Sequence, residues 1–281
     1  MRLSIDHVTT YRYESAASGI VQRLRLTPRS LDSQQVHHWL IDFDADGRLL
    51  EASDCHGNIV HMFYAERAVE SLTLHVSGEV TTFETSGVIG QTDELLPLGV
   101  YRRQTVLTRS DGAIRTFAEG CRADSPLAEA HRLMLAVHER IAFDAGATEA
   151  ATDAETAFRL GRGVCQDLTQ IFLAAARHLG HPCRYVQGHY AAPDHSEQEA
   201  AHAWAELWVP DLGWVTFDPT HGISAGEGHV RVAVGLDALD AAPVRGARRG
   251  GGAETLEVRV HGRAAVESHA SGAGWQGHAQ S

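Results

Sequence analysis

The chain has 281 residues, of which 43% are hydrophobic, and its 36 acidic residues against 24 basic ones give a formal net charge of −12 at pH 7. This length suffices for one large core or two ordinary ones. The acidic balance argues against nucleic-acid binding, because no cationic surplus is present to displace counterions from phosphate. All 24 basic residues are arginine, so the chain contains no lysine.

The compartment is predicted from the apolar segments and the cysteines. No basic segment followed by an apolar one marks a secretory signal, and the apolar runs are far shorter than the roughly 20 residues of a membrane span. We therefore expect a cytoplasmic protein with no membrane partner. In that compartment the four cysteines should be reduced, and should serve as core residues, ligands or nucleophiles rather than form disulfides.

Short segments rich in β-branched and aromatic residues dominate the first hundred positions. Strands are expected at 8–13, 21–27, 39–43, 59–64 and 72–80, with polar turns between them. Regular short strands of this kind predict a β-rich module resembling a sandwich or barrel. We assign residues 1–110 to it.

Helical periodicity begins after about residue 110. Ser125 is expected to cap a helix that reaches about residue 141, because apolar residues recur there at three- and four-residue spacing. A second helix is expected at 153–160, and a third from about Cys165 to Gly180.

Strand patterns return after the third helix. They cover 183–189, 203–209, 214–217 and 230–234, and complete a core that we assign to residues 111–245. The last part, residues 246–281, is rich in Gly, Ala and His, so we expect one strand at 256–260 and then a disordered tail.

Cys165 is the candidate nucleophile. It follows Gly163 and lies at or near the first turn of the third helix, where free N–H groups and the helix dipole stabilise a thiolate. Asp167, two residues later, is interpreted as interacting with the same helix N-terminus or as part of a structural ion pair. Position alone leaves both interpretations of Cys165 open, as a nucleophile or as an inert core cysteine.

A nucleophilic cysteine needs a base, and the base needs a residue that orients it. His202 opens one predicted strand and Asp218 ends the next, with a turn at 210–213. Alternation brings the two side chains to the same face only if the loop has an odd number of residues, as a three-residue loop has. His202 and Asp218 would then be neighbours, although an ordinary amphipathic hairpin explains the same pattern.

Three motifs occur in a fixed order along the chain: Gly163-Val164-Cys165-Gln166-Asp167, His202-Ala203-Trp204-Ala205-Glu206 and Phe217-Asp218-Pro219-Thr220. Together they resemble the core of bacterial transglutaminase-like proteins, from the papain-related superfamily with a Cys, His, Asp triad. Segments 8–13 and 24–29 resemble the β-rich N-terminal domain of this branch, and 231–235 and 243–246 resemble its C-terminal segments. The chain is thus identified as a member of the bacterial transglutaminase-like cysteine protease family, over nearly all its length.

The resemblance implies an α+β fold, in which a β-rich, sandwich-like domain precedes a papain-like core whose cysteine-bearing helix packs on an antiparallel sheet that carries the His and Asp. It implies Cys165 as nucleophile, His202 as general base and acid, and Asp218 as the residue that orients His202. The residues expected to shape the site or its oxyanion pocket are Gly163, Gln166 and Trp204. Two positions depart from the family pattern, His221 after Asp-Pro-Thr and Cys183, which we interpret as a core residue.

The implied reaction is cysteine-dependent acyl transfer on a carboxamide or peptide bond through a thioester, of the peptidase or amidase type. Two alternatives stay open: a protein-glutamine or small-amine transglutaminase, which would need an amine acceptor, and a non-catalytic binding module. An acidic run at 194–199 would attract an amine, although a solvated loop explains it equally. No cofactor or metal is expected, because the 18 His residues lack a metal-binding spacing.

Overall fold

The computed structural model of the chain describes residues 1–90, 92, 95–191, 198–199 and 201–264. The larger sheet contains β1 (Arg2–Thr27), β2 (Gln34–Phe43), β3 (Gly47–Ser53), β4 (Ile59–Ala65), β5 (Val69–Thr82), β10 (Gln198–Glu199), β14 (Val244–Gly250) and β15 (Glu254–Ala264). The smaller sheet contains β6 (Val88–Gly90), β9 (Cys183–Tyr190), β11 (Ala201–Val209), β12 (Gly213–Phe217) and β13 (His229–Gly235). The helices are η1 (Leu98–Arg102), α1 (Gly112–Glu119), α2 (Pro126–Arg140), α3 (Ala154–Leu160) and α4 (Cys165–His178), and the short strands β7 (Ala142–Phe143) and β8 (Arg162–Gly163) pair in parallel.

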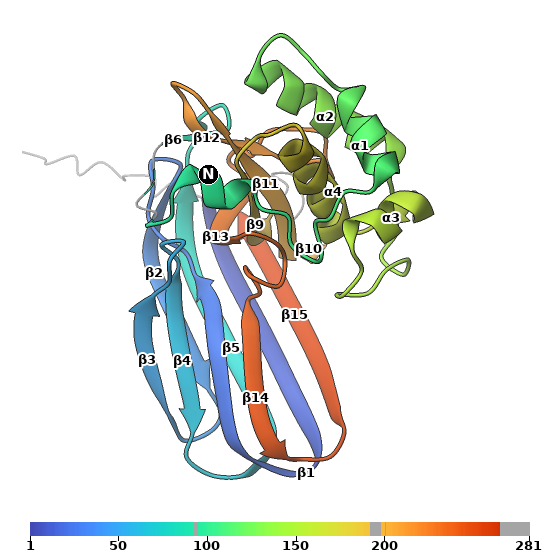
Figure 1. Cartoon of the computed structure of the whole chain (residues 1–281). Helices are drawn as coiled ribbons and strands as arrows, with labels where there is room; N and C mark the ends of the chain where they lie inside the picture. Colours follow the sequence, from blue (N-terminus) through green and yellow to red (C-terminus); the bar gives the residue numbers. More distant parts are fainter. Residues whose placement is uncertain (91, 93–94, 192–197, 200, 265–281) are drawn as a thin grey trace, which may run out of the picture.

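The long strand β1 organises the β-rich region (Figure 1). Its first half pairs with β5 and β15, and its second half pairs with β4 and β14. The pairing register shifts near Gly19, whose φ of +56° is a left-handed conformation that glycine adopts without steric cost. The two segments expected as separate strands, 8–13 and 21–27, are therefore parts of one bent strand.

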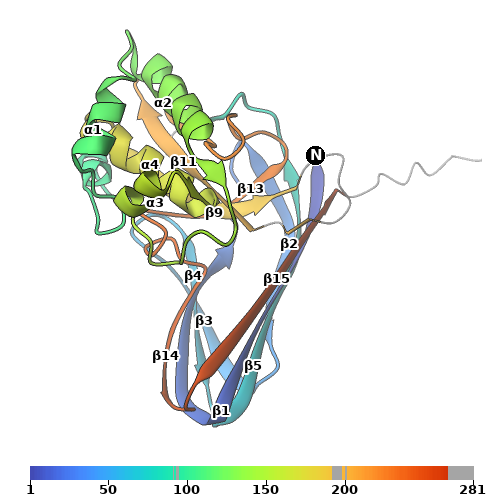
Figure 2. The same ribbon diagram turned by 90° about the vertical axis from the view of Figure 1, so that its right-hand side faces the viewer.

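The end of the described chain returns to the N-terminal region. β14 and β15 both pair antiparallel with β1, and Figure 2 shows them diverging from a shared turn. The expectation of a single strand at 256–260 is corrected to two strands, since β14 forms as well. The expected tail after residue 264 lies outside the described residues, and the proposed boundaries at 110 and 245 stay predictions.

The transition after residue 110 leads to helices packed on the smaller sheet. Helix α4 lies against β9 and β11, and α1, α2 and α3 surround it (Figure 1). The resulting core includes Phe172, Leu173 and Phe217, all fully buried. This arrangement places the N-terminus of α4 beside the sheet, as expected for a papain-like α+β core.

Local capping explains where the helices begin. The Ser125 side chain accepts from the Ala128 N–H at the start of α2, and Asp153 does the same for α3. Helix α1 was not predicted, although its cap Asp111 accepts from two backbone N–H groups. The helices at 125–141, 153–160 and from Cys165 onward are confirmed.

A buried charge cluster joins the smaller sheet to the β-rich region. Glu206 on β11 forms ion pairs with Arg184 on β9 (2.5 Å) and Arg231 on β13 (2.7 Å). The backbone of Arg231 in turn exchanges two hydrogen bonds with the Gln34 side chain on β2. The site-bearing sheet is therefore fixed to the N-terminal region by polar contacts that are shielded from water.

Two further findings concern membrane-spanning helices and the state of the cysteines. Among the described residues, no helix is both long and apolar enough to cross a bilayer. All four cysteines are free thiols: Cys55 is exposed, Cys165 is half-buried, and Cys121 and Cys183 are buried.

Candidate active site

Cys165 is the first residue of α4 and lies half-buried. As a first-turn residue, it has a backbone N–H without an intrahelical acceptor. The Asp167 carboxylate accepts from the N-cap Val164 N–H at 2.8 Å and from the Thr148 hydroxyl at 2.5 Å. Asp167 therefore caps the helix that presents the thiol, as interpreted from the sequence.

His202 reaches the site from β11. The hairpin of β11 and β12 pairs Val209 with Gly213, which confirms the three-residue loop expected from alternation. This register brings His202 and Asp218 together, with Nε2 of the ring 2.7 Å from Oδ2 of the carboxylate. The Cys165 side chain also interacts with His202 and helps to raise the pKa of its ring, so the three predicted triad residues come together.

The Asp218 carboxylate is fully buried, and three imidazoles surround one of its oxygens. Oδ2 accepts from His202 and lies 2.7 Å from Nδ1 of His221 and 3.1 Å from Nε2 of His229. Oδ1 accepts from the backbone N–H groups of Thr220 and His221. Burial alone would raise the pKa of Asp218, but these hydrogen bonds hold it well below its usual value, so the group is a carboxylate.

The protonation of His202 follows from its two partners. Burial would lower the pKa of His202, but the hydrogen bond to Asp218 and the interaction with Cys165 outweigh it and raise the pKa to about 9. An imidazolium is therefore favoured at neutral pH, held between a carboxylate and the thiol. A cysteine at a helix N-terminus, next to an oriented imidazolium, is the arrangement of an activated thiol nucleophile.

Two family models match parts of the chain, and one of them spans the candidate site. Residues 115–219 match the family described as the transglutaminase-like superfamily, and residues 3–81 match the bacterial transglutaminase-like N-terminal region. The chain has a transglutaminase-like core behind a bacterial transglutaminase-like N-terminal region. These two matches support a cysteine-based catalytic fold, and the first of them contains Cys165, His202 and Asp218.

Similar proteins match most of the length of the chain. An uncharacterised protein of Mycobacterium leprae is 29% identical over 278 residues, which is 92% of this chain and 97% of that protein. An uncharacterised protein of Mycobacterium tuberculosis is 28% identical over 272 residues, 87% of each chain. A crystal structure of a candidate cysteine protease from Cytophaga hutchinsonii superposes with a TM-score of 0.73 at 18% identity, covering 93% of this chain and 90% of that one, which shows a shared fold.

The residues expected to shape the site of the transglutaminase-like core have defined contacts. Trp204 is buried and stacks on His202, with ring centroids 5.9 Å apart. Gly188 faces them from β9, where a Cβ would lie 2.5 Å from the Trp204 ring, so the close approach requires glycine. The Gln166 amide donates to the Ala150 carbonyl at 3.0 Å and holds the preceding loop, while Gly163 is buried before Cys165. Their proposed part in an oxyanion pocket stays a prediction.

His221 and His229 were missed by the sequence reasoning as members of the site. Their donor atoms and those of His202 and Asp218 all lie within 4.8 Å of one another, a grouping that could hold a metal ion. A metal-ligating histidine normally donates its second ring N–H to an acceptor, but Nδ1 of His229 instead accepts from the Gly226 N–H. The contacts of His229 therefore fit a histidine that hydrogen-bonds to Asp218 and Gly226 better than they fit a metal ligand.

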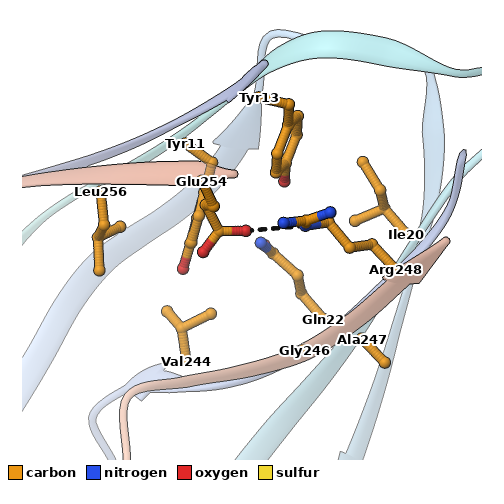
Figure 3. A pocket seen from close by; sticks show the side chains of 10 residues that line it. All are labelled: Tyr11, Tyr13, Ile20, Gln22, Val244, Gly246, Ala247, Arg248, Glu254 and Leu256. Carbon is orange, nitrogen blue, oxygen red and sulfur yellow. Dashed lines mark hydrogen bonds and ion pairs between the residues drawn. The ribbon is translucent and has the colours of Figure 1, made fainter. Parts of the chain in front are cut away.

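A cavity of about 390 Å³ lies elsewhere, between β1, β14 and β15. Figure 3 shows Arg248 and Glu254 meeting across it, beside the hydroxyl groups of Tyr11 and Tyr13. Its lining contains no cysteine and no histidine, so it offers neither a thiol nucleophile nor an imidazole base. The candidate catalytic residues therefore lie at the start of α4 and not in this cavity.

The raised pKa of His202 makes stability depend on pH. Because the folded-state pKa of about 9 exceeds the ordinary value of 6.5, the contribution is fully present below about pH 6.5 and is lost as pH rises through about 9. We expect the stability advantage of the wild type over His202→Gln to decline over that range, as measured by urea unfolding. An advantage that is independent of pH would contradict the ion pair.

Proposed function

We propose that the chain catalyses cysteine-dependent acyl transfer on carboxamide or peptide bonds, with water as the usual acceptor. The observation that supports this most is the connected series Cys165, His202 and Asp218, with the thiol at the N-terminus of α4. The reaction class also fits the transglutaminase-like core. A peptide or protein carboxamide is the substrate class, and a cytoplasmic location stays part of the proposal.

The first half of the proposed reaction forms a thioester. The Cys165 thiolate attacks the carbonyl carbon, and the Cys165 backbone N–H donates to the developing oxyanion. His202 gives its proton to the departing nitrogen as the C–N bond breaks, so ammonia or an amine leaves. Asp218 keeps the His202 ring oriented and stabilises its positive charge throughout.

The second half regenerates the thiolate. The now neutral His202 takes a proton from water, whose oxygen attacks the thioester carbonyl, and the C–S bond breaks as the acid product leaves. An amine acceptor in place of water would give an amide instead, which is the transglutaminase reaction. Water is favoured because Cys165 is only half-buried and therefore open to solvent.

The lack of lysine constrains the transferase alternative. The 281 residues offer no ε-amine, so Lys-mediated cross-linking of copies of this chain is impossible, and any ε-amine acceptor must come from another molecule. The acidic run at 194–199, one of whose two interpretations is attraction of such an amine, lies largely outside the described residues.

One experiment separates the three functions. Wild type and Cys165→Ala are incubated with Gln-containing and isopeptide-linked peptides and a labelled primary amine, and the products are identified by mass spectrometry. We expect deamidation or cleavage by the wild type and none by Cys165→Ala. Amine incorporation without hydrolysis would favour the transglutaminase, and unchanged peptides in both reactions would favour a binding module.

A further inference from the structure

One contact of Asp218 lies outside the proposed triad and comes from a different strand. His229 is the first residue of β13, and its Nε2 lies 3.1 Å from the same Oδ2 atom that receives His202. Its other ring nitrogen, Nδ1, accepts from the backbone N–H of Gly226 at 3.2 Å. Both ring nitrogens of His229 are therefore engaged, one by the carboxylate and one by the chain's own backbone.

These two contacts fix the tautomer of His229. A neutral imidazole carries one N–H and one lone pair. Since Nδ1 accepts from the Gly226 N–H, the proton must be on Nε2, and the ring donates to Asp218. Burial lowers the pKa of His229, which keeps the ring neutral and preserves this tautomer at neutral pH.

Aromatic packing fixes the ring plane as well. The Trp204 ring meets His229 edge-on with centroids 5.1 Å apart, and the Tyr190 ring lies 4.7 Å from it. Only 6% of His229 is exposed. The other extra imidazole, His221, has a side chain that is 36% exposed, so its contact with Asp218 competes with water.

We propose that His229 is a positioning residue, whose Nε2–H holds the Asp218 carboxylate in the orientation in which Oδ2 meets His202. The proposal rests on the proposed function, because it assigns His229 to the His202–Asp218 pair on which that function depends. His229 contacts neither the thiol nor a reacting atom; it acts through Asp218.

The geometry explains why the carboxylate needs a donor on this side. Oδ1 is held by the backbone N–H groups of Thr220 and His221, and Oδ2 is held from β13 by His229. Without His229, the partners of Oδ2 are His202 and the half-exposed ring of His221. The carboxylate can then turn toward the solvent-exposed side, which weakens its contact with the His202 imidazolium.

Two substitutions separate the functions of the two ring nitrogens. His229→Asn retains an acceptor near Nδ1 for the Gly226 N–H but does not reach Asp218. His229→Gln places an amide N–H near Nε2 and so retains the donor. His221→Leu is the matched control, because it removes the exposed donor from the same Oδ2 atom.

The readout is the titration midpoint of the His202 ring by NMR, together with the urea unfolding midpoint. The titratable groups that face His202 are Cys165, Asp218, His221 and His229, and the Tyr190 ring lies 5.6 Å away. We expect a wild-type midpoint near 9, lowered by about one pH unit in His229→Asn, a tenfold loss in the imidazolium-to-imidazole ratio. His229→Gln and His221→Leu should remain close to the wild type.

An unchanged midpoint in folded His229→Asn, with only a lower unfolding midpoint, would overturn the proposal and leave His229 a purely structural residue. A raised midpoint would also overturn it, since it would mean that losing the donor only strengthens the charge on Asp218. If His229→Asn does not fold, His229→Leu, which removes both contacts, is compared with His229→Gln, which retains the donor to Asp218. A wild-type midpoint near 6.5 would instead contradict the ion pair behind the proposed function.

Discussion

Asp218→Asn is expected to slow acyl transfer about 10⁴-fold, the loss seen when the orienting carboxylate of a Ser-His-Asp triad becomes an amide. Oδ2 of Asp218 accepts a hydrogen bond from His202 at 2.7 Å, and the rings of His221 and His229 lie within hydrogen-bonding distance of the same atom. An amide in its place carries no charge to stabilise the imidazolium and offers one oxygen where the carboxylate offers two. The measurement is the rate of ammonia release or peptide cleavage per mole of enzyme.

A matched control exists in the same chain. His56 and Asp240 form another His–carboxylate contact, 2.8 Å long and partly buried, outside the candidate active site. The contact with His56 lowers the pKa of Asp240 to about 2 although burial opposes the shift. Asp240→Asn should therefore reduce the unfolding midpoint while leaving the catalytic rate unchanged. A loss of less than tenfold in Asp218→Asn would show that His202 does not depend on that carboxylate.

Glu206→Gln should destabilise the fold by about 3–5 kcal/mol, the usual cost of removing one partner from a buried ion pair. Glu206 and Arg184 are completely buried, and Arg231 is 9% exposed. Burial would raise the pKa of Glu206, but the two guanidinium groups lower it, so a carboxylate balances both cations. With glutamine at this position, the two guanidinium groups would lose the buried carboxylate that they share.

Urea unfolding provides the measurement for Glu206→Gln. The matched control is Glu257→Gln, which removes the carboxylate from an exposed ion pair with Arg259 and should leave the unfolding midpoint unchanged. Equal effects of the two substitutions would mean that the buried cluster contributes no more than a surface pair. Arg184 also lies over the Trp214 ring, 3.9 Å from its centroid, so the destabilised variant should lose packing in the same region.

Much of the candidate site follows from local sequence rules. The cap at Asp153 and the left-handed Gly161 define helix α3, which leaves Cys165 to start the next helix. The three-residue loop between β11 and β12 fixes the register that joins His202 to Asp218. Each of these features depends on residues close in the sequence, so alternation and capping preferences are enough to predict them.

Other strands depend on tertiary pairing. β14 contains three arginines and two glycines, a composition that does not favour strands, and forms because it pairs with β1. β1 reads as two strands because Gly19 and small polar residues interrupt its apolar pattern. Long-range pairing overrides local propensity in both cases.

The two additional histidines of the site could not be placed from the sequence for a similar reason. His221 and His229 reach Asp218 through the loop between β12 and β13, whose course depends on the left-handed Gly222 and on the Gly226 N–H. Counting 18 histidines gave no means to select them. Placing His229 requires the strand order β13-β9-β11, which brings this residue beside the end of the β11–β12 hairpin and cannot be obtained from the local sequence.

The central claim is that Cys165 is an activated nucleophile, and the chain contains its own reference thiol. Cys55 is exposed, whereas Cys165 is half-buried, so accessibility alone favours Cys55. Treatment with less than one equivalent of iodoacetamide, followed by peptide mapping, should show Cys165 alkylated first in the wild type and Cys55 first in His202→Ala. Alkylation of Cys55 ahead of Cys165 in the wild type would contradict the claim.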